Sequence, residues 1–375
     1  MESNPILVTA AGGQSGRRQV VARKTAFSHK RTLALPKEVE CANHQPKGDE
    51  MKTLLKMVFA AAAALLITGS SLARAQEIPE GFFLPPINPT GATLVTQELS
   101  PGVYALLSDK PPVDNSGFVV GKRGVLVIDA HINGEMAGKI QQAVRAVTDK
   151  PILYLVNTNF HGDHTFGNYA FPAETQIIAH RKTAERMARF EEEKVLMLAI
   201  VGEAAVIADV ELRLPDILFD DHLTVDLGGR VVEIYHFGHG NTPGDTVVYV
   251  SEAKAAWTGN LVLGEGLIPF LIEGDAGAYL ETIARFARTL EIETIIPGHG
   301  LVAGQAVLGR DLAYLSGLID SVRKAVARGA TLEETLAALP LEKSYLPAPD
   351  SPLTGPVTGI HAWNVRKTYL DLTTD

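Results

Sequence analysis

The sequence is poor in cysteine, with Cys41 the only one among 375 residues. An intrachain disulfide is therefore excluded, and beyond residue 41 there is neither a thiol nucleophile nor a cysteine metal ligand. Charged residues make up 21% of the chain and hydrophobic residues 46%. This balance is typical of a folded globular protein and excludes a disordered or fibrous one.

Long apolar runs are also scarce, and the clearest one lies near the N-terminus. Met51 begins the pattern of a secretory signal peptide, with two lysines, an apolar run over residues 57–68 and the small-residue cleavage site Ala73-Arg74-Ala75. A transmembrane anchor is the alternative, but the run is shorter than the roughly 20 residues that span a bilayer. We therefore predict that residues 51–75 are a cleaved signal peptide and that the mature protein is periplasmic or secreted.

Residues 1–50 precede this signal, although a signal peptide normally begins the chain. We interpret them as an extension from a misassigned start codon. A twin-arginine signal at Arg17-Arg18 is the alternative, but the apolar run lies far downstream of that pair. Residues 76–375 then form the folded domain.

Basic residues are scarce in this predicted domain. The chain has 34 Lys and Arg against 43 Asp and Glu, and residues 1–75 hold 11 and 5 of them, so residues 76–375 carry a formal charge of −15. Such an acidic surface repels nucleic acid and anionic membranes. The expected partner is a small-molecule substrate, with no nucleic acid and no membrane after signal cleavage. The oligomeric state stays open.

Strand and helix patterns alternate along the domain. Short β-branched or apolar runs predict strands, and apolar residues at helical spacing predict helices. The predicted strands are 103–107, 117–120, 125–129, 152–156, 223–225, 231–235, 246–250 and 294–296. The predicted helices are 136–147, 279–290, 311–327, 332–339 and one around 365–370. This order predicts an α/β protein in which helices cover the outer faces of layered sheets.

Residues of metal-ligand type gather where predicted strands end. The four loops run over residues 157–164, 236–245, 257–260 and 297–300, and they contain the sequences Asn-Thr-Asn-Phe-His-Gly-Asp-His, His-Phe-Gly-His-Gly-Asn, Trp-Thr-Gly-Asn and Pro-Gly-His-Gly. The glycines let the backbone turn tightly beside the histidines. Loops at strand ends, far apart in sequence, are how an α/β scaffold builds a metal site.

The order and spacing of these loops resemble the metallo-β-lactamase superfamily, whose first motif is His-x-His-x-Asp-His. The resemblance covers about residues 94–299. It implies an αββα four-layer sandwich of the metallo-β-lactamase type, with metal bound at one edge of the two sheets, and a catalytic domain over residues 76–375.

Three positions depart from the superfamily pattern, and all three hold asparagine. Asn159 replaces the first histidine of the first motif, Asn241 replaces the histidine of the second loop, and Asn260 replaces the bridging aspartate. A neutral amide is a weak ligand for zinc. One of the two metal sites implied by the resemblance therefore keeps only His161, and we predict that it is empty.

The other implied site is complete in Asp163, His164 and His299. Two imidazoles and one carboxylate, with a position left for water, form a catalytic zinc pattern. We therefore predict one zinc per chain. The alternative is a partial second site in which a shifted loop brings His239 beside His161.

This ligand set implies a hydrolase in which a zinc-bound hydroxide attacks a small electrophile. The predicted catalytic residues are Asp163, His161 and Asn260. The predicted substrate-binding residues are Asn159, Asn241, His239 and Trp257, with core packing as the alternative for the tryptophan. The charge run over residues 191–194 is predicted to be a solvated helix face.

The substrate class stays open between several hydrolytic functions. Esters, lactones, thioesters and amides are the general expectation for the superfamily. A narrower alternative is hydrolytic dehalogenation, because the site resembles that of chlorothalonil hydrolytic dehalogenases, which use one zinc and an active-site asparagine. β-Lactam hydrolysis and a non-catalytic zinc-binding protein are further alternatives.

The signal-peptide pattern makes a direct prediction about the secreted protein. Cleavage after Ala75 places the mature N-terminus near Gln76. N-terminal sequencing of protein from the periplasm or medium tests it, and a mature chain that begins at Met1 or Met51 would contradict it.

Overall fold

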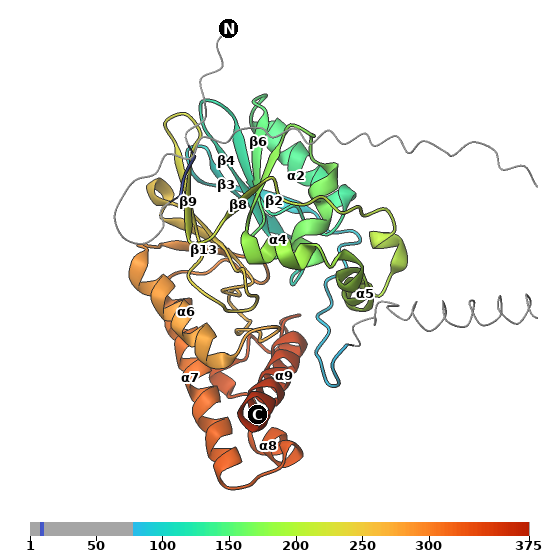
Figure 1. The fold of residues 1–375 in the computed structure, drawn as a ribbon, viewed down its shortest axis with the longest axis vertical. Helices are drawn as coiled ribbons and strands as arrows, with labels where there is room; N and C mark the ends of the chain where they lie inside the picture. Colours follow the sequence, from blue (N-terminus) through green and yellow to red (C-terminus); the bar gives the residue numbers. More distant parts are fainter. Residues whose placement is uncertain (1–7, 11–77, 375) are drawn as a thin grey trace, which may run out of the picture. The chain divides into compact units, whose positions relative to one another are not determined.

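Two β-sheets dominate the computed structural model, which describes residues 8–10 and 78–374 (Figure 1). The predicted signal peptide and its cleavage site, residues 51–75, lie outside the described residues. Among the helices that are described, none has the length and hydropathy needed to cross a membrane.

The first sheet of the described residues has seven strands in the order β2-β3-β4-β5-β6-β7-β8. They are β2 (Leu94–Ser100), β3 (Val103–Ser108), β4 (Ser116–Val120), β5 (Val125–Ile128), β6 (Ile152–Val156), β7 (Gln176–His180) and β8 (Ile217–Phe219). Strands β2 to β5 are antiparallel, and β5 to β8 are parallel. Every side chain of β5 is buried, as expected for a parallel strand covered on both faces.

The second sheet has the order β1-β9-β10-β11-β12-β13 in the described part of the chain. Its strands are β1 (Val8–Ala10), β9 (His222–Asp226), β10 (Val231–Tyr235), β11 (Val247–Val250), β12 (Ala255–Gly259) and β13 (Thr294–Pro297). Only β12 and β13 pair in parallel, because α6 (Ala276–Thr289) connects them as a crossover helix.

Three apolar cores define the layers. One core joins side chains of both sheets, such as Leu126 and Val156 from the first and Val232 and Val248 from the second. A second lies between the first sheet and α2 (Gly134–Val147). The third packs the second sheet against α6, α7 (Ala306–Ala327) and α9 (Thr354–Thr373). The sheets therefore face each other with helices outside, which confirms the predicted αββα arrangement.

The remaining helices are short. They are α3 (Gly162–Thr165), α4 (Arg181–Met187), α5 (Phe190–Val201) and α8 (Leu332–Ala338). Figure 1 shows α7, α8 and α9 together at the end of the molecule opposite β3, β4 and β6. The α9 helix begins well before the predicted segment around 365–370. It can include Pro356 because this residue lies in the first turn, where the backbone N–H groups have no helical partner.

Trp257 lies in the core, which corrects the prediction that it binds substrate. Its side chain is 2% exposed within the cluster between the two sheets. The indole Nε1 donates to the Ser116 carbonyl over 3.1 Å. A Cβ at Gly117 would lie 2.2 Å from that nitrogen, so the glycine makes room for the ring. Trp257 therefore joins the sheets and does not form a wall of the pocket.

Candidate metal centre

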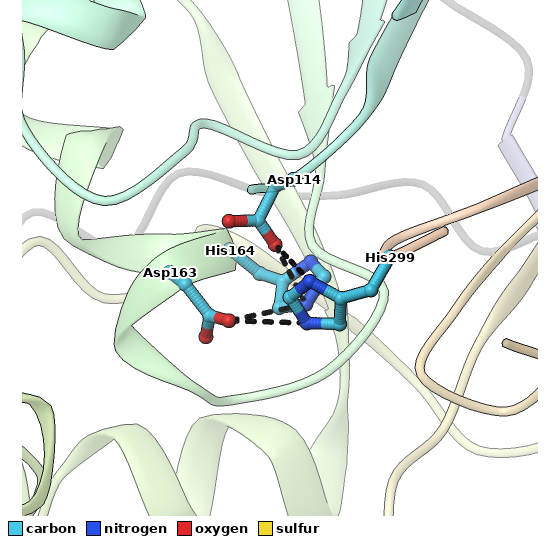
Figure 2. A group of neighbouring side chains, drawn as sticks. All are labelled: Asp114, Asp163, His164 and His299. Atoms are coloured by element: carbon cyan, nitrogen blue, oxygen red, sulfur yellow. Dashed lines mark ion pairs between the residues drawn. The ribbon is translucent and has the colours of Figure 1, made fainter. Parts of the chain in front are cut away.

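Four side chains from three segments of the chain lie close together (Figure 2), and we call them the donor group. Asp114 lies between β3 and β4, Asp163 and His164 are on α3 directly after β6, and His299 follows β13. Their potential ligand atoms all lie within 4.8 Å of one another. Strand β6 of the first sheet and β13 of the second each pair in parallel within their own sheet, and the loops that follow them carry Asp163, His164 and His299.

The structure brings together the three predicted ligands. His299 Nε2 lies 3.2 Å from Asp163 Oδ2, and His164 Nε2 lies 4.0 Å from the same oxygen. The two imidazole rings meet edge to face, with centroids 5.5 Å apart. This spacing leaves a common point between the donor atoms, as a bound ion requires.

Asp114 completes the group and was missed by the sequence analysis. Its Oδ1 lies 3.5 Å from both His164 Nε2 and His299 Nδ1, and the residue is 2% exposed. It belongs to no recognised motif and comes before its strand, whereas the predicted ligands follow theirs. The one available signal was a carboxylate directly before the buried strand β4, in a loop that also contains Asn115.

The electrostatics of the group favour a bound cation. Burial and the neighbouring Asp163 carboxylate raise the pKa of Asp114. Burial lowers the pKa of His164, but the Asp129 and Asp163 carboxylates outweigh it and raise that pKa to about 9. Asp114 Oδ1 and Asp163 Oδ1 are buried without a hydrogen-bond partner. Two buried carboxylates with open oxygens are costly unless a positive charge neutralises them.

These donors fit a transition-metal ion such as zinc. Zinc prefers imidazole nitrogen and carboxylate oxygen, commonly with three or four protein ligands. A ligand histidine must be neutral and must point its free nitrogen at the ion. The hydrogen bonds around both imidazoles engage Nδ1 and leave Nε2 of each ring near Asp163. A bound cation would displace the proton that the raised pKa keeps on His164 at neutral pH.

Asp129 orients His164. The imidazole Nδ1 donates to Asp129 Oδ2 over 2.9 Å, and the same carboxylate accepts from the Thr158 backbone N–H and hydroxyl over 2.8 and 2.7 Å. Nε2 is thereby left facing the cluster. Asp129 has a positive φ of 59° and His131 one of 66°, a strained backbone that often marks functional sites.

The Asp114 loop is tied to the His299 loop. His299 Nδ1 donates to the Pro112 carbonyl over 2.8 Å, which leaves Nε2 for a ligand. The Asn115 amide donates to the Pro297 and Gly300 carbonyls, each over 3.0 Å. These bonds hold the ligand atoms in place through protein contacts alone.

His131 fixes the backbone of Asp114. Its Nε2 donates to the Asp114 carbonyl over 3.1 Å, and burial lowers the pKa of the imidazole to about 3. The ring is therefore neutral at physiological pH and adds no charge to the cluster.

The asparagines at the other implied metal site are used differently. Asn159 Oδ1 accepts from the His161 backbone N–H over 2.8 Å, and Asn241 Nδ2 donates to the Phe270 carbonyl over 2.7 Å. In the part of the chain that the structure describes, neither His161 nor His239 belongs to a group of three or more potential metal ligands. Asn159 and Asn241 thus form hydrogen bonds that stabilise the loops around this position.

His161 is paired with Glu193, which corrects the predicted solvated face of residues 191–194 at this one position, since Glu191 is exposed and Glu192 and Lys194 are half-buried. The imidazole Nδ1 donates to Glu193 Oε1 over 3.1 Å, and the Gly162 N–H donates to the same oxygen over 3.0 Å. Glu193 is only 8% exposed. The second imidazole nitrogen, Nε2, is buried and has no protein partner.

A small pocket, with a cavity volume of about 40 Å³, opens beside the donor group. Its polar lining comes from His161, Asp163, Asn241, Asn260 and His299, and neither Asn159 nor His239 is part of it. Its apolar lining comes from the chain before β2, from α5 and from the segment after β12, namely Phe82, Pro85, Ile87, Leu196, Met197, Ile200, Leu263, Phe270 and Ile272. No Lys or Arg is among these lining residues.

Comparisons with known proteins agree with this architecture. The sequence profile of the metallo-β-lactamase superfamily matches residues 110–299. A metallo-β-lactamase from Pontibacter korlensis is similar at 20% identity, with 60% of this chain and 99% of that chain covered and a TM-score of 0.46. One from Erythrobacter litoralis has 19% identity, 60% and 96% coverage and a TM-score of 0.48.

A stereoselective inverting sec-alkylsulfatase from Pseudomonas sp. is similar over more of the chain. The identity is 17%, the coverage is 74% of this chain and 50% of that chain, and the TM-score is 0.55. This chain therefore matches half the length of the alkylsulfatase. At such identity the likeness concerns the fold alone.

The donor group makes a prediction about zinc affinity. Asp114→Asn keeps the shape of the side chain but removes its charge, so the affinity for zinc should fall about 10-fold to 100-fold. Asp163→Asn should lower it at least as much. Zinc stoichiometry and Kd are measured by competition with a chromophoric chelator.

Asp311→Asn is the matched control. Asp311 is a buried carboxyl outside the donor group, and burial raises its pKa to about 8, so it is largely neutral at pH 7 and its replacement should leave zinc binding unchanged. Wild-type affinity in Asp114→Asn would exclude Asp114 as a ligand.

Proposed function

The chain belongs to the metallo-β-lactamase superfamily of metal-dependent hydrolases, and we propose that it uses one zinc ion to hydrolyse a small, uncharged and largely apolar electrophile. The ligands in this proposal are Asp114, Asp163, His164 and His299. Esters, lactones, thioesters and amides are the substrate classes that fit. The signal-peptide pattern supports action in the periplasm or outside the cell.

The observation that carries the proposal is the lining of the pocket. Nine of its residues are apolar, and no lysine or arginine is present. β-Lactams carry a carboxylate and alkyl sulfates carry a sulfate, and anions of both kinds are typically bound by cationic side chains. A pocket without such a side chain favours a neutral substrate.

Zinc held by the donor group would supply an activated water, because such a site lowers the pKa of bound water to about 7. The protein itself supplies a proton acceptor and a hydrogen-bonding amide. His161 lines the pocket, Glu193 fixes its Nδ1, and its Nε2 has no protein partner, so the imidazole can accept or return a proton.

Asn260 lies beside His164 and lines the same pocket as His161. Its Oδ1 is 3.1 Å from His164 Nε2, and the Tyr279 hydroxyl holds its backbone carbonyl over 3.0 Å. An amide at this position brings no negative charge to the pocket and can donate to an oxygen or a halogen that gains charge during the reaction.

Hydrolytic dehalogenation of a chlorinated aromatic ring is a second candidate. The Phe82 and Phe270 rings stack with centroids 5.6 Å apart, and both residues line the pocket. Aromatic surface of this kind suits a planar apolar ring. The amide of Asn260 suits a departing chloride better than a carboxylate would, because it does not repel it.

Turnover on a substrate panel tests the proposal. Zinc-loaded protein is assayed with p-nitrophenyl butyrate, a δ-lactone, an aryl thioester, a chlorinated aromatic dinitrile, nitrocefin and p-nitrophenyl sulfate. We expect kcat/KM to be at least about 100-fold higher on a neutral substrate than on either anion, since a buried charge without a partner costs several kcal/mol. Preference for an anion would contradict the proposal, and absence of all turnover would favour a non-catalytic zinc protein.

Asn260→Asp tests the role of the amide. A carboxylate next to the reacting atoms repels an electron-rich transition state, so kcat should fall about 10-fold to 100-fold with zinc content still one per chain. The triple variant Asn159→His, Asn241→His, Asn260→Asp is the comparison. Higher activity with a second equivalent of zinc in the triple variant would show that the asparagines are remnants of a two-metal enzyme.

A further inference from the structure

The segment Leu261–Ile272 forms one wall of the pocket, and we call it the wall segment. It connects β12 to α6 and contributes Leu263, Phe270 and Ile272 to the lining. It contains no helix or strand, so regular backbone hydrogen bonding does not fix its shape. Contacts from elsewhere in the molecule must do so.

The first half of the wall segment is attached to the loop that carries His299. Gly264 N–H donates to the His299 carbonyl over 2.9 Å, and Glu265 N–H donates to the Leu301 carbonyl over 3.2 Å. This half is thus fixed relative to the metal ligands. The pocket-lining Phe270 is in the other half.

The second half is held by two neighbouring side chains of α9. Asn364 Oδ1 accepts from the Leu271 N–H over 2.9 Å, and its Nδ2 donates to the Pro269 carbonyl over 2.6 Å. Trp363 Nε1 donates to the Leu271 carbonyl over 2.6 Å. Three backbone groups of the two residues that flank Phe270 are therefore bonded to one turn of α9. This helix lies outside residues 110–299.

The same turn of α9 also holds the aromatic surface of the pocket. The Trp363 ring meets Phe82 edge to face, with centroids 4.9 Å apart, and Phe82 stacks on Phe270. Asn364 is fully buried in the interior of α9, where asparagine is a weak helix former. Its amide atoms bond the wall segment and the Tyr314 hydroxyl, the latter over 3.0 Å, so the polar side chain is satisfied in the core.

We propose that Trp363 and Asn364 are positioning residues that set the shape of the substrate pocket, and thereby its selectivity, from outside the metal-binding part of the chain. Among the described residues, their hydrogen bonds and ring contacts go to the wall segment, Tyr314 and Phe82, and not to the donor group or His161. Without their bonds, the hydrogen bond from Asn241 Nδ2 to the Phe270 carbonyl is the side-chain bond that remains on Pro269 to Leu271 in the described part of the chain. The backbone on both sides of Phe270 and its side chain can then move, while the ligands keep their own supports. The selectivity part of this inference rests on the proposed function, whereas the positioning part does not.

Hydrogen–deuterium exchange tests positioning without any substrate. In Asn364→Ala, peptides covering 261–272 should exchange about tenfold faster or more, whereas peptides covering 157–165 and 294–300 should keep the wild-type rate. Trp363→Phe keeps an aromatic ring and removes one hydrogen bond, so it should show a smaller change in the same peptides. It also serves if Asn364→Ala fails to fold.

Tyr314→Phe is the matched control. It removes the hydroxyl that accepts from Asn364 Nδ2 and leaves the bonds from Asn364 to Pro269 and Leu271 in place. It should reduce thermal stability without faster exchange at 261–272. Equal exchange in wild type and Asn364→Ala, or the same increase in Tyr314→Phe, would overturn the positioning role.

Binding and kinetics test selectivity. The affinity for the neutral dye N-phenyl-1-naphthylamine should fall severalfold in Asn364→Ala and stay unchanged in Tyr314→Phe. With p-nitrophenyl esters of increasing acyl length, KM should rise most for the longest chain, while kcat for the acetate and zinc content stay at wild-type values.

Uniform loss of kcat, or unchanged dye binding and unchanged KM, would contradict the proposal. If wild type hydrolyses no ester, the proposed function fails for that class, and exchange and dye binding still decide the positioning role.

Discussion

Burial of two carboxylates beside two imidazoles is the constraint around which this structure is organised. The charges of the donor group are shielded from water, and a bound cation directly offsets the cost of burying its carboxylates. The supporting bonds run through Asp129 and backbone carbonyls of neighbouring loops. The donor group and the edge of the sandwich are therefore stabilised by the same contacts.

Much of the fold followed from local pattern. Strands such as β6 and β10 were predicted with their observed bounds, because each is a short apolar run closed by a polar loop. The ligands Asp163, His164 and His299 followed from strand-end loops and from the family resemblance. Asp114 did not, because its role depends on the long-range approach of its loop to the one after β13, held by Asn115, and no local pattern encodes that approach.

Other residues had a local pattern that pointed away from their role. Glu193 lies in a charge run typical of a solvated helix face, yet it is buried against His161. Trp257 was predicted to lie in a loop of ligand-type residues, but it belongs to β12, and its ring packs in the core between the sheets. Strand β8 was not predicted, because three residues are too few to show an alternating pattern. Its pairing with β7 defines it. Tertiary contact decided each of these cases.

Because α9 holds the wall segment, the type of reaction and the range of substrates depend on different parts of the chain. The groups that determine the type of reaction lie within residues 110–299, whereas Trp363 and Asn364 lie beyond them. Substitutions in the C-terminal helix can therefore change which molecules are accepted while every metal ligand stays the same. Relatives with an identical donor group can diverge in substrate, and a comparison limited to the shared motifs would place them together.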